Sequence, residues 1–191
     1  MKGIGKEMLL TMKTPQDVLQ YWFQELDSKS RFAKNDNVDQ KIRELFLQTH
    51  ADVVNGKTTE WKKTPEGRLA EIVVLDQFSR NMFRDSAKAF ATDALALEFA
   101  QAAVAAGDDQ KLPPQQRAFI YIPYMHSEDR KVHKEAVRLF SQPGLEDNLK
   151  YELLHKAIID RFGRYPHRNQ VLGRISTNEE LEFLKERGSS F

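Results

Sequence analysis

The chain has 191 residues, of which 40% are hydrophobic and 30% are charged, values typical of a globular protein rather than a disordered one. Its 29 basic and 28 acidic residues leave a net charge of +1, which excludes a general electrostatic attraction to nucleic acid or to an anionic membrane. The absence of cysteine excludes disulfides, thiol nucleophiles and thiolate metal sites.

The N-terminal segment, residues 1–12, has no stretch of the roughly 7–15 apolar residues that a signal peptide needs. The longest aliphatic run in the chain, Ile72–Leu75, is far shorter than the roughly 20 residues that span a bilayer. We therefore expect a cytoplasmic protein with no membrane partner, a flexible leader at 1–12 and a single domain at 13–191.

Helix-start signals recur along this expected domain. Thr14-Pro15 and Thr64-Pro65 each combine an N-cap residue with a proline at the first helical position, and Thr177 with Glu180 matches a capping box. No stretch alternates in the way that demands a strand, although a buried strand is the alternative for residues 72–75. The fold prediction is one all-α bundle or superhelix of about seven to nine helices. The predicted helices cover about 15–26, 38–54, 69–83, 86–106, 113–121, 128–140, 145–162 and 177–187.

Two residues in the second half of the chain are expected to interrupt or end predicted helices. Pro123 is expected to interrupt the helix that begins at Pro113, because proline cannot donate the backbone hydrogen bond of a helix interior. Gly163 is expected to end the helix that begins near residue 145.

The first segment with polar residues of interest is 75–84. Asp76, Arg80 and Arg84 lie four residues apart, so they share a helix face and can pair. They adjoin the most hydrophobic part of the chain, where an unpaired charge is costly. Either they form a structural ion-pair network, or an arginine keeps donors for an anionic ligand.

The second segment is Tyr121–Asp129. A histidine and a carboxylate one residue apart, His126 and Glu128, can act as a proton-transfer pair or as two metal ligands. Ser127 is expected to be an N-cap, with Asp129 in the first helical turn. His133, one turn further on, is expected at the surface.

The third segment, Arg161–Arg174, contains four arginines and one histidine but no acidic residue. Two glycines and a proline predict an irregular loop whose backbone amides can face a ligand. Arginine donors match carboxylate and phosphate groups, so this segment predicts an anion-binding loop, with a structural clamp as the alternative. Its candidate ligand contacts are Arg164, His167, Arg168 and Asn169. The patch is too short to follow a nucleic-acid backbone.

These segments, together with Tyr21-Trp22-Phe23 and Phe90-Ala91-Thr92-Asp93, resemble the bacterial family called domain of unknown function 924. The resemblance covers about residues 15–184. Two positions depart from the family: Ser79 stands where proline is usual, and Phe32 lies where tryptophan is commoner. The resemblance implies a tetratricopeptide-like helical fold and no particular activity.

The functional hypothesis is a single site that binds a small anion carrying phosphate or carboxylate; whether it is catalytic stays open, and no cofactor is indicated. Glu128, His126 and His167 are the candidate catalytic residues, and the candidate ligand contacts are Arg80, Arg84, Arg164, Arg168, Asn169 and Asp76. One alternative is a scaffold that binds an acidic or C-terminal peptide in a groove. Another is a metal-dependent hydrolase that uses His126, Glu128 and His167, a ligand set suited to zinc, manganese or iron.

Overall fold

The computed structural model describes residues 13–190, and every regular element in that part of the chain is helical. The α-helical segments are α1 (Pro15–Gln20), α2 (Ser28–Phe32), α3 (Asp36–Val54), α4 (Pro65–Val73), α5 (Ser79–Met82), α6 (Asp93–Ala105), α7 (Pro114–Met125), α8 (Arg130–Phe140), α9 (Glu146–Phe162) and α10 (Asn178–Phe183). A π-turn joins α4 and α5 into one helix, which leaves nine separate helices in the described residues. The predicted all-α class is confirmed, whereas the expected leader at 1–12 lies outside the described residues.

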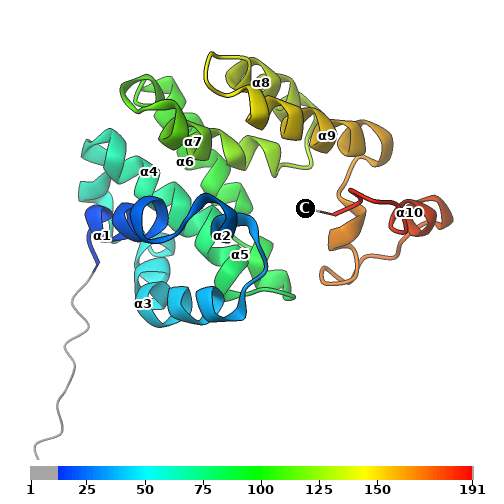
Figure 1. Cartoon of the computed structure of the whole chain (residues 1–191), viewed down its shortest axis with the longest axis horizontal. Helices are drawn as coiled ribbons and strands as arrows, with labels where there is room; N and C mark the ends of the chain where they lie inside the picture. The colour runs from blue at the N-terminus through cyan, green and yellow to red at the C-terminus, as the bar shows by residue number, and fades with distance from the viewer. Residues whose placement is uncertain (1–12, 191) are drawn as a thin grey trace, which may run out of the picture.

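The helices are arranged in an arc that follows the order of the sequence. Figure 1 shows α1–α5 at one end, α6 and α7 in the middle and α8 and α9 beyond them, while α10 lies apart and the chain end returns toward the middle. One hydrophobic cluster fills the bundle from α1 to the start of α9. A second, smaller cluster contains Ile158, Ile159, Tyr165 and Phe183 and holds α10 against the end of α9. In the described residues, no helix is both long enough and apolar enough to traverse a lipid bilayer.

The predicted helix starts at three threonines are confirmed. The side chain of Thr14 accepts a hydrogen bond from the backbone amide of Asp17 at 3.2 Å. Thr64 and Thr177 make the equivalent contacts in α4 and α10, at 3.1 and 3.2 Å. Each contact satisfies one of the amides that a helix leaves unpaired at its first turn.

The helix formed by α4, the π-turn Val74–Phe78 and α5 is the centre of the bundle. The side chains of Leu69, Ile72, Leu75 and Phe78 are completely buried, so the predicted central helix at 69–83 is confirmed and the strand alternative is wrong. The π-turn places one extra residue in the helix, and side chains beyond it are rotated relative to those before it.

Several predicted helix boundaries are wrong for identifiable reasons. The helix of Pro114 continues through Pro123 to Met125, because residues on both sides of this proline are buried and their packing outweighs the lost hydrogen bond. Residues 87–90 form a separate 3₁₀ turn before α6, since the Thr92 hydroxyl donates to the Leu75 carbonyl at 2.7 Å and holds the chain out of a helix there.

Two further ends differ from the prediction. The N-cap of α8 is Asp129 rather than Ser127, and the Ser127 side chain instead accepts from the Asp129 amide. The last helix ends at Phe183, whereas the prediction extended it to 187. The predicted stop at Gly163 is confirmed, and this glycine adopts the left-handed conformation with φ of 70°.

A close approach of backbone at the start of α4 requires a glycine. A Cβ atom on Gly67 would lie 1.9 Å from the carbonyl oxygen of Trp61, so the backbone of either α4 or the preceding turn would have to move. We expect Gly67→Ala to lower the free energy of unfolding by about 2–3 kcal/mol, the usual cost of overpacking. Urea denaturation of the wild type and the variant measures this difference in the free energy of unfolding.

Gly107→Ala is the matched control. Gly107 has φ of 69° but no atom within 4 Å of an added Cβ, so that variant should lose only the roughly 1 kcal/mol of left-handed backbone strain. Equal losses in the two variants would contradict the close approach as the cause.

Candidate functional site

The most completely buried charged group of the predicted site is Asp76, on the π-turn of the central helix. Its side chain is 1% exposed, and its Oδ1 atom lies 2.7 Å from Nδ1 of His126 and 3.1 Å from the guanidinium of Arg80. Gln77 donates to the other oxygen at 2.6 Å. Burial opposes the ionisation of Asp76, but the Arg80 charge and the His126 hydrogen bond outweigh it and hold the pKa of this carboxyl below its usual range.

The hydrogen bond to Asp76 fixes the tautomer of His126. An ionised carboxylate only accepts, so Nδ1 of His126 must donate, and Nε2 of the neutral ring keeps its lone pair. Burial lowers the pKa of His126 and repulsion from Arg80 adds to this, while Asp76 acts in the opposite direction. Nε2 has no protein partner among the described residues, and the side chain is 16% exposed. The arrangement leaves a neutral, oriented imidazole with a free proton-accepting nitrogen.

A second carboxylate, Asp93 at the start of α6, joins two arginines from distant segments. Arg80 donates to both its oxygens, at 2.9 and 3.0 Å, and Arg168 donates to Oδ2 at 3.2 Å. The guanidinium of Arg168 lies over two aromatic rings, 4.7 Å from the centre of Phe90 and 4.4 Å from that of Tyr165. These contacts bring the first and third predicted segments together.

Tyr165 also connects the histidines of this region. Its ring centre lies 5.8 Å from that of His155 and 5.6 Å from that of His167, and the ring of His155 lies 6.3 Å from that of His126. Burial is the main reason that the pKa of His155 falls to about 3 and that of His167 to about 4, and the Arg168 charge lowers both further. We call the group of Asp76, Arg80, Asp93, His126, His155, Tyr165, His167 and Arg168 the polar cluster.

Two consecutive members of the polar cluster have buried nitrogens without a partner in the part of the chain that the structure describes. They are Nδ1 of His167 and Nε of Arg168, and the Arg168 side chain is only 7% exposed. A buried donor that lacks an acceptor costs about 1–3 kcal/mol, so such atoms are rare unless a ligand or water completes them.

Glu128 holds the third segment in place. Both its oxygens accept from Arg174, at 2.7 and 3.0 Å, and one also accepts from the Tyr165 backbone amide at 2.8 Å. Arg174 reaches further, to the side chain of Asn169 at 2.9 Å. Glu128 thus lies close to the polar cluster, but its oxygens are occupied by this structural contact.

Arg164 and Asn169 are occupied in a similar way by α10. Arg164 donates to both oxygens of Glu180, at 2.6 and 2.8 Å, and to the carbonyl of Ile175 at 2.9 Å. Asn169 is 1% exposed and donates to Ser176 and Glu180, at 3.0 and 3.3 Å. The arginine clamp that the sequence offered as an alternative therefore describes Arg164.

The structure directs Arg84 away from the polar cluster. Its guanidinium donates to both oxygens of Asp39 in α3, at 2.5 and 2.8 Å, and Asn81 donates to the same carboxylate at 2.7 Å. Among the predicted site residues, Asp76, Arg80, His126, His167 and Arg168 converge, whereas Arg84 pairs with a different helix. Sequence spacing alone placed Arg84 on the face of Arg80, and it could not identify the partner on α3.

His133 is completely buried, so its expected surface position is wrong. Its Nδ1 lies 2.8 Å from Oε1 of Glu152, which is also completely buried, and its Nε2 lies 2.8 Å from the Ser127 carbonyl. Burial raises the pKa of Glu152. The His133–Glu152 pair joins α8 to α9 next to Tyr165, whose hydroxyl lies 3.3 Å from Nε2 of His133.

The hydroxyls of Ser79 and Thr92 form a hydrogen-bonded chain that excludes nucleophilic catalysis by Ser79. The Thr92 hydroxyl donates to the Leu75 carbonyl, so Thr92 accepts from Ser79 at 2.9 Å, and Ser79 in turn accepts from Nε2 of His50 at 2.8 Å. The histidine therefore donates to the serine instead of removing its proton. Ser79 is completely buried, and this chain does not prepare it as a nucleophile.

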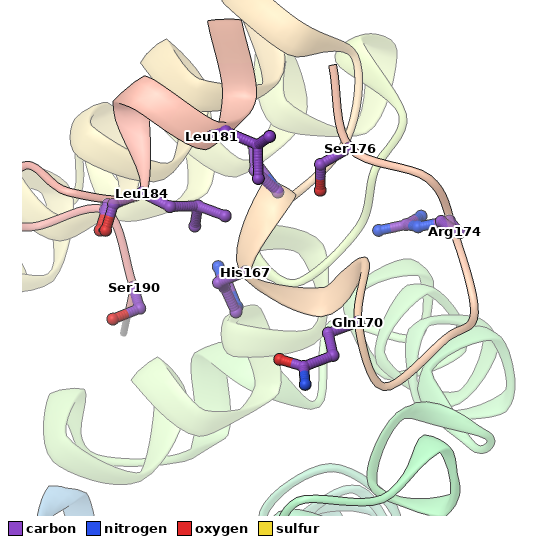
Figure 2. Close-up of a pocket in the computed structure, with 9 residues that line it drawn as sticks. His167, Gln170, Arg174, Ser176, Leu181, Leu184 and Ser190 are labelled. Carbon is purple, nitrogen blue, oxygen red and sulfur yellow. The ribbon is translucent and has the colours of Figure 1, made fainter. Parts of the chain in front are cut away.

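A cavity of about 620 Å³ lies beside the polar cluster on the C-terminal side, and His167 belongs to both. Figure 2 shows the labelled side chains around the cavity, with His167, Gln170 and Arg174 on the third segment and Leu181 and Leu184 on the last helical segment. The residues that line it are Pro166, His167, Gln170, Arg174, Ser176, Leu181, Leu184, Ser189 and Ser190.

Three members of the polar cluster were not among the candidate site residues of the sequence analysis: Asp93, His155 and Tyr165. Asp93 and Tyr165 were noted only within motifs of the family, because their partners come from segments about 13 to 75 residues away. His155 lies in α9 with no distinguishing local pattern, and only the packing of α9 on the third segment reveals it.

The chain was compared with protein families and with known proteins. The family model "Bacterial protein of unknown function (DUF924)" matches residues 18–188. A solved structure of a protein of unknown function, ATU0120 from Agrobacterium tumefaciens, is 34% identical, with a TM-score of 0.85 over 90% of this chain and 96% of that one. No curated protein matches. This chain therefore belongs to the DUF924 family of bacterial proteins.

Proposed function

We propose that the polar cluster binds a small anion that carries a phosphate or carboxylate group and that His126 accepts a proton there. The observation that carries the proposal is that two consecutive residues each have a buried nitrogen without a partner among the described residues, Nδ1 of His167 and Nε of Arg168. An anion supplies the acceptor that the Arg168 donor lacks, and a charged acceptor makes the stronger hydrogen bonds.

The charges of the polar cluster are compatible with a bound anion. Arg80 and Arg168 share one carboxylate, Asp93, and Asp76 faces Arg80 and His126. With the histidines neutral, the two arginines and two carboxylates balance. An added anion therefore meets no net negative charge, and it favours protonation of the nearby histidines. His126, oriented by Asp76, has the geometry of a general base.

The two alternative functions receive less support from the contacts. A metal site built on His126, Glu128 and His167 requires a free carboxylate, yet Glu128 is held by Arg174 and the Tyr165 amide. Within residues 13–190, no group of three or more histidine or acidic side chains is arranged to hold a metal ion. A peptide-binding scaffold explains neither buried nitrogen.

Removal of Arg168 tests the proposal with inorganic phosphate as the probe. We expect Arg168→Ala to weaken phosphate binding by about 1.5–3 kcal/mol, or roughly 10- to 150-fold, because a hydrogen bond to a charged group is lost. Arg168→Lys should recover only part of the loss, since lysine keeps the charge and loses the planar set of donors. Isothermal titration calorimetry measures the dissociation constants.

Arg138→Ala is the control, because Arg138 is an exposed arginine that pairs with Glu135, away from the polar cluster. It should leave phosphate binding unchanged. If Arg168→Ala does not fold, His167→Gln and Arg168→Lys give the same comparison in less disruptive form. Phosphate that binds wild type and both Arg168 variants equally would refute the proposed site.

A further inference from the structure

The cavity beside the polar cluster has a lining without acidic side chains: among the described residues, neither an aspartate nor a glutamate belongs to it. The lining instead combines hydrogen-bond donors with an apolar strip. Such a cavity, a few hundred cubic ångströms in volume with a few polar groups at defined positions, is the usual form of a small-molecule site.

The hydrogen-bond donors of the lining lie on the third segment, and some of their N–H groups are free to bind a ligand. Of the five N–H groups of Arg174, four point to Asn169, Glu128 and the Tyr165 carbonyl, so one on its terminal nitrogen remains. Gln170 is exposed, and its side-chain amide makes no hydrogen bond with any other described residue. Both side chains belong to the lining of the cavity together with His167, as Figure 2 shows.

The apolar strip faces these donors from the last helix. Leu181 on α10 and Leu184 at its end are three residues apart, so they lie on one side of the helix, and Leu181 is 49% exposed. Ser189 and Ser190 close the cavity from the chain end; the Ser189 hydroxyl donates to the Leu184 carbonyl at 3.2 Å. The cavity thus has a polar, donor-rich side and an apolar side.

We infer that this cavity binds a small organic acid with an apolar body. Its carboxylate would accept from Arg174, Gln170 and His167, and its hydrocarbon part would pack on Leu181 and Leu184. The inference goes beyond the proposed function, because His167 is the one member of the polar cluster in the described lining of this cavity, and it assigns the cavity a class of ligand of its own. A purely inorganic anion would leave the leucine side of the cavity without a contact.

Hexanoate is the probe, with acetate and 1-hexanol as matched controls. Each buried methylene contributes about fourfold in affinity, so hexanoate should bind at least tenfold more tightly than acetate, which lacks the chain. Hexanol lacks the charge and should also bind at least tenfold more weakly. Amide chemical shifts of Gln170, Leu181 and Leu184 should move on titration with hexanoate and give its dissociation constant.

A charge placed in the cavity tests its location. Leu181→Asp adds a carboxylate to a lining that has none, so it should weaken hexanoate binding at least tenfold. Leu47→Asp is the control, because Leu47 on α3 is a leucine of similar exposure, 45% against 49%, and does not line the cavity. It should leave hexanoate binding unchanged.

The outcomes separate this inference from the proposed function. Loss of hexanoate binding in Leu181→Asp, with phosphate binding insensitive to Arg168→Ala, would retain the cavity and refute the anion site of the polar cluster. If Leu181→Asp leaves hexanoate binding unchanged while Arg168→Ala weakens phosphate binding, the anion site is retained and the inference is overturned. Equal binding of hexanoate and acetate, or chemical-shift changes outside the cavity only, would also overturn it.

Discussion

Asp76→Ala is expected to lower the free energy of unfolding by about 1.5–3 kcal/mol, because it removes the buried charged acceptor that Arg80 and His126 share, while Arg80 keeps its pairing with Asp93. It also releases His126, whose Nδ1 is hydrogen-bonded to Asp76. Asp76→Asn should cost less, since the amide keeps the shape and one oxygen acceptor but loses the charge. Chemical denaturation monitored by circular dichroism gives the three free energies.

Asp160→Ala is the matched control for this loss. Asp160 pairs with Lys156 on the outside of α9, and its side chain is 48% exposed, so an exposed ion pair of this kind contributes less than about 1 kcal/mol. If Asp76→Ala and Asp160→Ala lost similar amounts, the Asp76 network would not be the stabilising connection between α7 and the central helix.

Acid should destabilise the protein well above the pH at which carboxylates titrate. Burial and the Arg168 charge depress the pKa of His155 to about 3 and that of His167 to about 4, whereas both have values near 6.5 in the unfolded chain. A depressed pKa means that the folded state excludes the proton. The stability that these neutral rings contribute is therefore complete above about pH 6.5 and is lost as the pH falls toward about 4 and 3.

The size of this effect follows from proton linkage. Each histidine that binds a proton only after unfolding removes up to about 1.4 kcal/mol per pH unit, so two of them should remove roughly 3–5 kcal/mol between pH 6.5 and pH 4.5. Lowered pKa values of His50 and His126 act in the same direction. Urea denaturation at several pH values measures the slope.

The double variant His155→Gln, His167→Gln should flatten this slope over the same pH range. His133 is left intact in that variant, so the buried pair with Glu152 continues to join α8 to α9. A wild-type stability that stays constant from pH 7 to pH 4.5 would mean that the histidines are already charged in the folded protein.

Much of the fold could be predicted because its signals are local. The threonine caps determine the helix starts, and the apolar residues concentrated in 69–83 determine the central helix, through residues that are neighbours in sequence. The continuation of the helix through Pro123 could not be predicted in this way, because it depends on packing against other helices. His133 could have been placed correctly: it precedes Ala136 by three residues and Phe140 by seven, and all three are buried.

The candidate site was predictable only in part, for a related reason. Asp76 and Arg80 pair across one helical turn, and the spacing of four residues indicates this directly. Which arginine keeps a free donor depends instead on partners far away in sequence. Glu180 occupies Arg164, Asp39 occupies Arg84, and Arg168 keeps an unpaired nitrogen between two aromatic rings.

The π-turn at Val74–Phe78 has a consequence for how this protein tolerates changes in length. Asp76 within the turn faces His126 on α7, while Asn81 beyond it faces Asp39 on α3. A deletion of one codon here would restore a regular α-helix and rotate everything after it by about 100° relative to everything before. The two contacts could not then form together. Substitutions in this segment change one side chain at a time, whereas a single-residue insertion or deletion would uncouple two helices at once.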